Sequence, residues 1–213
     1  MHIPDGILPV PVSAGGYAVA AAATWYSLRK INQKENPRED VPKAALLTAA
    51  FFVASWIHIP VPPASVHLVL NGLLGAVLGY FAFPAIVIGL FFQAVMFQHG
   101  GLTTLGANAV IMGLPALAAH YIFRLRNLGD RWNRTKVAVL GFLSGSLAVG
   151  ISVAIFIAVL LTNLPSQLDA PTEMTAIYAL AIAHLPLMGI EGVITTMLVL
   201  FIRRVRPTIL DGV

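Results

Sequence analysis

The sequence contains no cysteine and little charge, since Asp, Glu, Lys and Arg together make up 10% of its 213 residues. An ordinary soluble domain carries about 25% charged residues, and 58% of this chain is hydrophobic. The lack of cysteine excludes a disulfide framework and any thiolate nucleophile or metal ligand. The lack of charge excludes a typical cytosolic enzyme, a nucleic-acid-binding protein and a disordered tail. It leaves an integral membrane protein made of helices.

Several functional motifs are absent as well. The sequence has no Walker A phosphate loop, no His-Glu-x-x-His zinc motif and no Gly-x-Ser-x-Gly nucleophile elbow. It also lacks the basic n-region of a signal peptide, because the first Lys or Arg is Arg29. We therefore expect the mature chain to begin at Met1. We also expect that any ATP-driven activity depends on partner proteins.

Seven apolar stretches predict an all-α integral membrane protein, a seven-transmembrane-helix bundle that forms a single domain over residues 1–213. The third and fourth stretches are separated only by Phe83-Pro84, which predicts a tight helical turn there. The second and fourth are short for a full span and favour little tilt or re-entrant structure. The expected helices lie near 13–32, 44–59, 66–82, 84–97, 106–123, 136–162 and 174–203.

The 13 Lys and Arg fall into three segments only, at residues 29–43, 124–136 and 203–206. With seven spans, all three segments lie on one side of the membrane. The positive-inside rule makes that side cytoplasmic. The sequence therefore predicts a multi-pass cell-membrane protein with its N-terminus outside and its C-terminus in the cytoplasm.

The N-terminal dipeptide Met1-His2 is a chelate suited to square-planar metal ions. A free α-amine, the deprotonated amide nitrogen of His2 and the His2 imidazole form a five-membered ring fused to a six-membered ring, which holds three nitrogens nearly coplanar. One more nitrogen completes a square, and square-planar nitrogen coordination is typical of Ni(II) and Cu(II). Because all three groups must lose protons to bind, the affinity should rise with pH.

Two histidines are candidates for the fourth nitrogen, because both fall at the predicted outer level of the membrane. His67 stands at the outer start of the third stretch, and His58 stands at the outer end of the second. A glycine-rich face follows His67 and would let the N-terminal segment approach the backbone closely; it consists of Gly72, Gly75 and Gly79.

Six motifs spread over the whole chain carry a family resemblance. They are Met1-His2-Ile3-Pro4-Asp5-Gly6, Ile57-His58-Ile59-Pro60, Ser65-Val66-His67-Leu68, Gln93, Gly100-Gly101 and Gly106-Ala107-Asn108. In these motifs the chain resembles the NikM/CbiM family, the substrate-binding membrane subunits (S components) of energy-coupling-factor transporters for nickel or cobalt. The start of the chain is the most specific of the six.

The resemblance implies seven helices with the N-terminal segment inserted into the bundle. It implies a metal ion held by the Met1 amine, the amide and imidazole of His2, and the imidazole of His67. The function it implies is high-affinity capture of Ni(II) at the outer membrane face, with Co(II) for cobalamin supply as the alternative. The implied partners are a transmembrane coupling (T) subunit, ATPase (A) subunits and, as a further candidate, a small accessory membrane protein. The ion is then the transported substrate, and no organic cofactor is implied.

Five other residues are candidates for extra ligands or for hydrogen bonds to the metal-binding nitrogens: Asp5, His58, Gln93, His99 and Asn108. Asp5 is explained equally well as a turn-capping residue or as an acceptor that holds His2 or the amine. Gln93 and Asn108 either hold the inserted N-terminal segment or bridge helices. Gln98-His99 departs from the family pattern, which has small or acidic residues there, and His99 adds an imidazole.

The second stretch carries small residues at four-residue spacing. Such faces let helices approach each other closely, although alanine is common in any span. In S components generally, a comparable face docks on the coupling subunit. The candidate docking residues are Ala45, Ala49, Ala50 and Ala54.

Two rival functions remain open at this point. A vitamin-type S component would bind an organic substrate in an aromatic-lined cavity and would hold no ion. A membrane enzyme would use His184 and Glu191 as acid and base, because Glu191 is the only acid deep within a predicted span. Glu191 is also explained as a structural carboxyl group that bonds another helix, and we prefer that interpretation.

Overall fold

The computed structural model describes residues 2–61, 64–129, 133–163 and 170–210. The helical fold predicted from the sequence is confirmed, with one short antiparallel hairpin added to it. The described residues form helices α1 (Val10–Ile31), α2 (Val41–Ala54), α3 (Asn71–Leu78), α4 (Ala82–Phe97), α5 (Leu105–Arg124), α6 (Arg134–Asn163) and α7 (Ala170–Val205), strands β1 (His58–Val61) and β2 (Ala64–His67), and 3-10 turns at Pro37–Asp40, Gly79–Phe81, Leu125–Asn127 and Pro207–Leu210.

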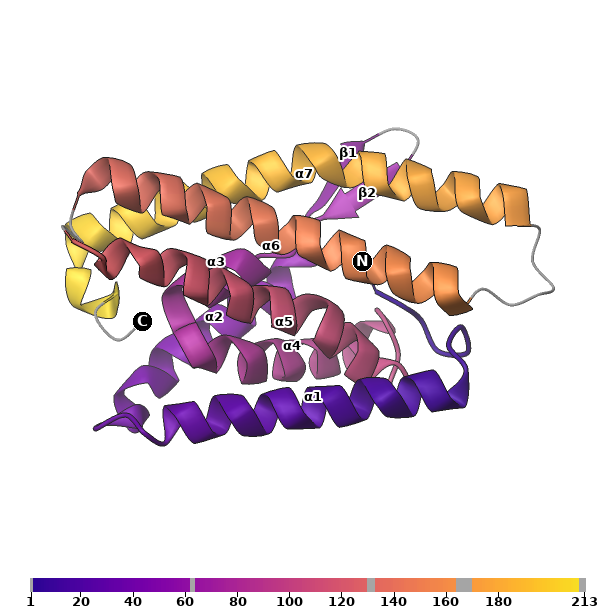
Figure 1. Cartoon of the computed structure of the whole chain (residues 1–213), viewed down its shortest axis with the longest axis horizontal. Helices are drawn as coiled ribbons and strands as arrows, with labels where there is room; N and C mark the ends of the chain where they lie inside the picture. Colours follow the sequence, from indigo (N-terminus) through magenta and orange to yellow (C-terminus); the bar gives the residue numbers. More distant parts are fainter. Residues whose placement is uncertain (1, 62–63, 130–132, 164–169, 211–213) are drawn as a thin grey trace.

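The longer helices run roughly along one common direction in an elongated bundle (Figure 1). Helices α6 and α7 are the two longest and pack side by side along one flank, while α1 lies along the opposite flank. Helix α5 lies between the flanks and packs against α1, α3, α4 and α6. The interior of the bundle is therefore built around α5 and the short helix α3.

Helix α3 is the most enclosed element, because all eight of its residues are buried. Its glycines explain how other backbones come so close. A Cβ atom at Gly72 would overlap the carbonyl oxygen of Ser144 in α6, and one at Gly75 would overlap the carbonyl oxygen of Ala116 in α5. Small residues allow this kind of close helix approach in membranes. The predicted role of Gly72 and Gly75 differs in one respect: they face α6 and α5 rather than the N-terminal segment.

The break between the third and fourth helices lies earlier than the sequence predicts. Gly79 adopts a φ of 60° and ψ of −126° and ends α3, and a 3-10 turn then leads into α4. Phe83 and Pro84 lie inside the first turn of α4. Proline is tolerated there because the first turn of a helix leaves its N–H groups without intrahelical partners. Gly79, rather than Pro84, therefore ends the helix.

The second predicted helix is shorter than expected, because α2 ends at Ala54 and His58–Val61 forms strand β1. Strand β1 pairs antiparallel with β2, with His58 opposite His67. Pro60 explains part of this change, since a residue that precedes proline is driven out of the α region. The third predicted helix likewise begins late, at Asn71, because residues 64–67 belong to β2.

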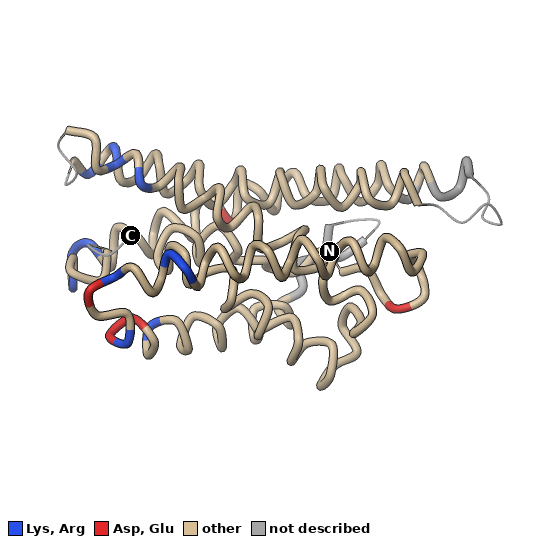
Figure 2. Tube along the Cα trace, turned by 60° about the horizontal axis from the view of Figure 1, so that its bottom comes forward, with Lys and Arg blue, Asp and Glu red and all other residues tan. Residues whose placement is uncertain are grey.

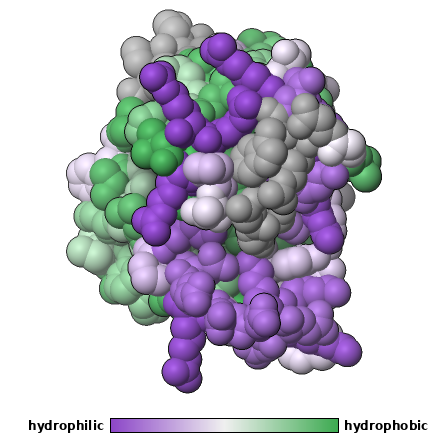
Figure 3. All heavy atoms as spheres, turned by 90° about the vertical axis from the view of Figure 1, so that its left-hand side faces the viewer, coloured by the Kyte–Doolittle hydropathy of each residue, from purple (hydrophilic) through white to green (hydrophobic). Residues whose placement is uncertain are grey.

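Lysine and arginine gather at one end of the bundle, which is also the end that holds the C-terminus (Figure 2). Seen from that end, the surface is dominated by hydrophilic residues, whereas the visible flank is largely hydrophobic (Figure 3). Within the described residues, four helical segments are long and apolar enough to cross a membrane: Asn71–Phe97, Leu105–Asn127, Arg134–Asn163 and Ile177–Val205. Seven spans and the orientation of the termini stay predictions.

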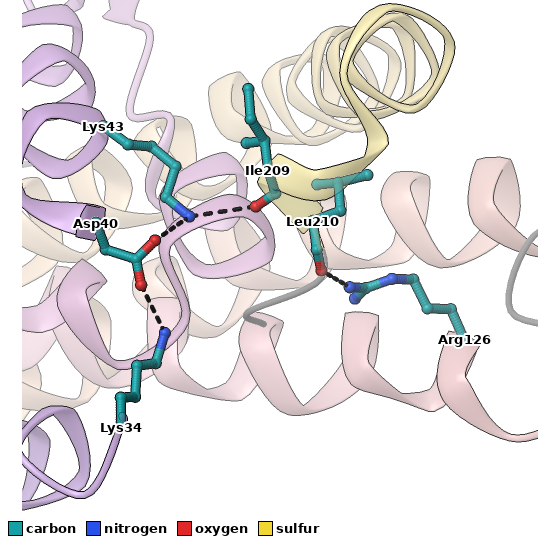
Figure 4. A network of polar contacts seen from close by, with 6 residues as sticks. All are labelled: Lys34, Asp40, Lys43, Arg126, Ile209 and Leu210. Atoms are coloured by element: carbon teal, nitrogen blue, oxygen red, sulfur yellow. Dashed lines mark hydrogen bonds and ion pairs between the residues drawn. The ribbon is translucent and has the colours of Figure 1, made fainter. Parts of the chain in front are cut away.

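A polar network fastens the C-terminal turn to this basic end (Figure 4). Asp40 accepts hydrogen bonds of 2.9 Å from both Lys34 and Lys43. Lys43 also donates to the carbonyl oxygen of Ile209 at 3.2 Å, and Arg126 donates to that of Leu210. Burial raises the pKa of Asp40, but the two ammonium groups outweigh this effect and hold the pKa below its ordinary value. The C-terminal turn is thereby tied to α2 and to the 3-10 turn that follows α5.

The close approach of α3 and α5 is testable with one methyl group. We expect Gly75→Ala to lower the melting temperature in detergent, because overpacking costs about 1–3 kcal/mol and the overlap here is with backbone. Gly15→Ala in α1 is the matched control, because nothing lies within 4 Å of a Cβ atom at Gly15. Tryptophan fluorescence on heating measures both. Equal melting temperatures for the two variants would contradict the packing described here.

Candidate metal centre

Three imidazoles from distant parts of the chain converge at one place. His2 comes from the N-terminal segment, His67 from the end of β2 and His99 from the connection after α4. The ring centroid of His2 lies 4.2 Å from that of His99 and 5.1 Å from that of His67, and the His67 and His99 centroids are 5.1 Å apart. One nitrogen of each ring lies within 4.8 Å of the others. Since metal–imidazole bonds are about 2.0–2.1 Å long, small rotations suffice to bring all three onto one ion.

The ring of His2 is held in an orientation that suits the predicted chelate. Its Nε2–H donates to the side-chain carbonyl oxygen of Gln93 at 2.9 Å, while Nδ1 is buried without a hydrogen-bond partner. Nδ1 is the nitrogen that closes a six-membered ring with the His2 amide on a shared ion. Burial, reinforced by His67 and His99, lowers the pKa of His2 well below its ordinary value. The imidazole is therefore neutral, the form that binds metal ions.

His67 is buried and is oriented by its own backbone. Its Nδ1–H donates to the carbonyl oxygen of Leu68 at 2.9 Å. A hydrogen bond of this kind sets the tautomer of a histidine and makes the other ring nitrogen, here Nε2, the candidate ligand for a metal ion.

The position of His99 depends on how α4 ends. Gln98 follows the helix with a φ of 53°, and this left-handed residue turns the chain back toward the N-terminal segment. The backbone N–H of His99 donates to the backbone carbonyl oxygen of Gln93 at 3.1 Å. Gln93 thus contacts two members of the cluster, His2 through its side chain and His99 through its backbone.

The N-terminal segment is clamped into the bundle by Asn108 of α5. The amide oxygen of Asn108 accepts from the backbone N–H of Ile3 at 2.9 Å, and its amide nitrogen donates to the Ile3 carbonyl at 3.0 Å. The hydroxyl of Thr104 donates to the same carbonyl at 2.6 Å. The Ile3 side chain is only 1% exposed. Both backbone polar groups of Ile3 are satisfied inside the protein, which allows the segment to lie away from water.

Asp5 holds the same segment to the connection before α5. Its carboxylate accepts from the backbone N–H and hydroxyl of Thr103, at 2.9 and 2.5 Å, and from the backbone N–H of Leu102 at 3.3 Å. Gly101 leaves room for this contact, because a Cβ atom there would overlap the carboxylate. The Thr103 hydroxyl is the main reason that the pKa of Asp5 lies below its ordinary value. The carboxylate therefore remains charged at a pH where a free aspartate begins to protonate.

The structure brings together most of the residues predicted for this site. His2, His67 and His99 form the cluster, Gln93 bonds His2, and Asn108 bonds Ile3. Met1 lies outside the described residues, and so does the side chain of His58, whose backbone belongs to β1. The hydrogen bonds of Asp5 run to Thr103 and Leu102 of the connection before α5 rather than to an imidazole. They favour a structural role for Asp5 over the role of an acceptor for His2.

Sequence reasoning missed the contribution of Thr103 and Thr104. Thr104 stands directly before α5, where a threonine side chain ordinarily caps the helix. Its hydroxyl makes no cap hydrogen bond and instead reaches Ile3 and the carbonyl of Gly101. A threonine pair before an apolar helix was a signal for a helix start, but the sequence carries no sign that its partner would be the N-terminus.

The remaining candidates lie elsewhere. The Nδ1–H of His184 donates to the carbonyl oxygen of Leu180 in its own helix. Glu191 bonds the backbone amides of Val69 and Leu70. Across the described ranges, the hydrogen bonds of His184 and Glu191 run to backbone groups and not to each other.

The predicted docking alanines divide into two groups. Ala45 and Ala49 line a groove of about 570 Å³ between α2 and α4, whose other lining residues are almost all apolar. Ala50 is exposed outside this lining, and Ala54 is buried in the core at 4% exposure. Ala54 therefore cannot form part of an exposed docking face with Ala50.

Asn108 is predicted to control the insertion of the N-terminal segment. We expect Asn108→Leu to speed hydrogen exchange of the Ile3 amide by about 10-fold or more, since each lost hydrogen bond is worth about 1 kcal/mol. Exchange followed by mass spectrometry of the N-terminal peptide measures this. Asn163→Leu is the control, because Asn163 bonds Val159 and Thr162 of its own helix. Unchanged exchange in Asn108→Leu would contradict the clamp.

The chain is similar to known metal transport proteins. Residues 2–209 match the family model CbiM, described as "Cobalt uptake substrate-specific transmembrane region". A "Putative metal transport protein" of Haemophilus influenzae is 32% identical over 211 residues, covering 99% of this chain and 97% of the relative. The "Fused nickel transport protein NikMN" of Rhodobacter capsulatus is 32% identical over 224 residues, covering 99% of this chain but only 64% of that longer protein.

A solved structure shares the fold. The chain titled "Crystal Structure of an Truncated Transition metal Transporter" superimposes with a TM-score of 0.74 and 26% identity, covering 96% of this chain and 99% of the other. The family model spans nearly the whole sequence, including the imidazole cluster and the helices that position it. The chain belongs to the CbiM family of substrate-specific transmembrane regions for cobalt uptake.

Proposed function

We propose that this chain captures Ni(II) at the outer membrane face, as the substrate-specific subunit of an ATP-driven energy-coupling-factor importer. The single observation that carries the proposal is the convergence of His2, His67 and His99, whose ligating nitrogens lie within 4.8 Å of one another. The names of similar proteins support it: the family model names cobalt uptake, and two relatives are named for metal transport and for nickel transport. The ion is the substrate of the protein, not a resident cofactor.

The donor set favours nickel. Imidazole is a common ligand for Ni(II), and four nitrogens in a plane are typical of Ni(II) or Cu(II). In a chain that starts at Met1, the α-amine, the His2 amide and His2 Nδ1 supply three of them, and His67 Nε2 supplies the fourth. His99 then stands beside the square as a fifth nitrogen. Co(II) more often takes octahedral or tetrahedral surroundings, so a fifth ligand makes cobalt the alternative cargo.

The charge pattern supports capture from outside. The basic end of the bundle holds the C-terminus, and the N-terminus lies away from that end (Figure 2). Basic segments face the cytoplasm in membrane proteins. With the basic end inside, the imidazole cluster belongs to the outer half of the protein. Capture there requires the ion to lose most of its water and exchange it for imidazole nitrogens.

Transport requires partners under this proposal, because the sequence has no phosphate loop for ATP. The partners are a transmembrane coupling subunit and ATPase subunits, with a small accessory membrane protein as a further candidate. The groove between α2 and α4, lined by Ala45 and Ala49, is the docking surface for the coupling subunit. It is apolar and its alanines leave room for a helix to approach closely.

Metal content tests the capture step. We expect about one nickel per chain after exposure to Ni(II), measured by mass spectrometry on purified protein with any tag at the C-terminus. His67→Ala should lose most of this metal because it removes a ligand, while His184→Ala should keep it because His184 lies outside the cluster. The same measurement after exposure to Co(II) decides between the two ions.

Three alanines placed before Met1 test the N-terminal chelate within the same series. They move the amine out of reach of the His2 imidazole, so nickel should be lost while the imidazoles remain. Equal nickel in both forms would overturn the amine as a ligand and leave the three imidazoles as the site. No metal in either form would overturn the proposed function and favour a vitamin-type S component.

Docking is tested with one bulky side chain. We expect Ala49→Trp to abolish co-purification with the coupling and ATPase subunits, because an indole fills the groove. Nickel content should be unchanged, since Ala49 does not contact the imidazole cluster. Leu46→Trp is the control, because Leu46 lies on the same helix, is 71% exposed and does not line the groove. Intact co-purification of Ala49→Trp would rule out this surface.

A further inference from the structure

We propose that Glu191 of α7 is a positioning residue for the metal centre, and that it acts on His67 through the peptide group between Leu68 and Val69. This inference rests on the proposed function, since it assumes that His67 is a metal ligand. It concerns a residue outside the cluster, contributed by a helix that supplies no imidazole to it.

Glu191 is completely enclosed, with 0% of its surface exposed. One carboxylate oxygen accepts from the backbone N–H of Val69 at 2.5 Å, and both oxygens lie 3.0 Å from the N–H of Leu70. Its partners are all backbone groups of the short connection between β2 and α3, which follows His67 directly. The carboxylate therefore fixes the segment that carries His67 to α7.

The contact gives hydrogen-bond partners both to backbone N–H groups and to a carboxylate that would each be costly to bury alone. A helix begins with N–H groups that lack intrahelical partners, and inside a membrane-spanning bundle water cannot serve them. A buried carboxylate has the opposite need, since it requires several donors. Leu70 stands immediately before α3 with a φ of 55°, a left-handed conformation that is uncommon for leucine. The double contact to its N–H holds the backbone in that conformation.

The link to His67 runs through one planar peptide group. The N–H of this group belongs to Val69 and donates to Glu191, while its C=O belongs to Leu68 and accepts from His67 Nδ1–H. Peptide planarity fixes the relative direction of the two bonds. Hydrogen bonds in series polarise one another, so a carboxylate on the N–H makes the C=O a stronger acceptor.

The effect on the metal ligand follows from this series. A stronger acceptor at Nδ1–H holds the imidazole ring in place and makes Nε2 a better donor to a metal ion. Metal-binding histidines usually receive this support from a carboxylate or carbonyl directly, and losing it costs about 10–100-fold in metal affinity. Here a carboxylate and a carbonyl act in sequence, joined by the amide of Val69.

The test replaces the charge without changing the shape. We expect Glu191→Gln to weaken nickel binding by about 10-fold or more, measured by calorimetry, and to shift the visible absorption bands of bound nickel. Glu191→Asp keeps the charge and should recover part of the affinity, and it also serves as the readout if Glu191→Gln does not fold. Thr196→Val is the matched control on α7, because it removes a hydrogen bond to Ala138 of α6 and does not touch residues 67–70.

The outcomes separate this inference from the proposed function. In a His67→Ala background, Glu191→Gln should no longer change the residual affinity or the absorption spectrum, because the residue acts through His67. Wild-type affinity and spectrum in Glu191→Gln would overturn the inference and leave the metal centre intact. Equal losses in Glu191→Gln and Thr196→Val at equal melting temperatures would also overturn it, as a purely structural role. Absence of nickel from the wild-type protein would instead overturn the proposed function.

Discussion

The structure depends on pairing backbone polar groups where water cannot reach them. A membrane-spanning bundle must satisfy such groups internally, and two stretches of non-helical backbone near the imidazole cluster show how this is done. The first is the N-terminal segment, where the side chain of Asn108 hydrogen-bonds both the N–H and the C=O of Ile3. The second is the connection into α3, where Glu191 occupies the N–H groups of Val69 and Leu70. Each of these two stretches carries one histidine of the cluster, so the side chains that bond its backbone also position that imidazole.

Rigidity at these two points bears on selectivity as well as on position. Affinity alone does not separate nickel from its neighbours, because Cu(II) binds nitrogen ligands at least as well and cobalt binds somewhat less tightly. In the proposed site, the imidazoles held by Gln93 and by the Leu68 carbonyl resist rearrangement to the geometry of another ion. His99 follows a left-handed turn in a connection rather than a helix or strand. In the proposed site it is the ligand through which a second coordination geometry is most readily reached.

Sequence reasoning succeeded where the signal was local. The apolar stretches located α1, α5, α6 and α7 to within a few residues, and the N-terminal motif pointed to His2. It failed where a tertiary contact outweighed local preference. Residues 58–61 continue an apolar run yet form a strand. Helix α3 ends at Gly79, although Phe83-Pro84 is the stronger local signal for the end of a helix. The hairpin depends on pairing between β1 and β2, and the end of α3 depends on how closely this helix packs between α5 and α6. Both are contacts between separate segments, so the sequence of one segment does not predict them.

The sequence by itself determined the helical membrane fold, the three basic segments, the family and the histidines worth examining, because periodicity, charge and motif are properties of neighbouring residues. Only the tertiary structure decided that His99 joins His2 and His67, that Thr104 bonds Ile3 rather than capping α5, and that Glu191 contacts the segment next to His67. His67 and His99 are 32 positions apart in the sequence. The other contacts named here join residues more than 90 positions apart, up to 122 for Val69 and Glu191. Their physical reason is the need of buried polar groups for partners, which can be met by any correctly placed donor or acceptor and therefore leaves no local pattern.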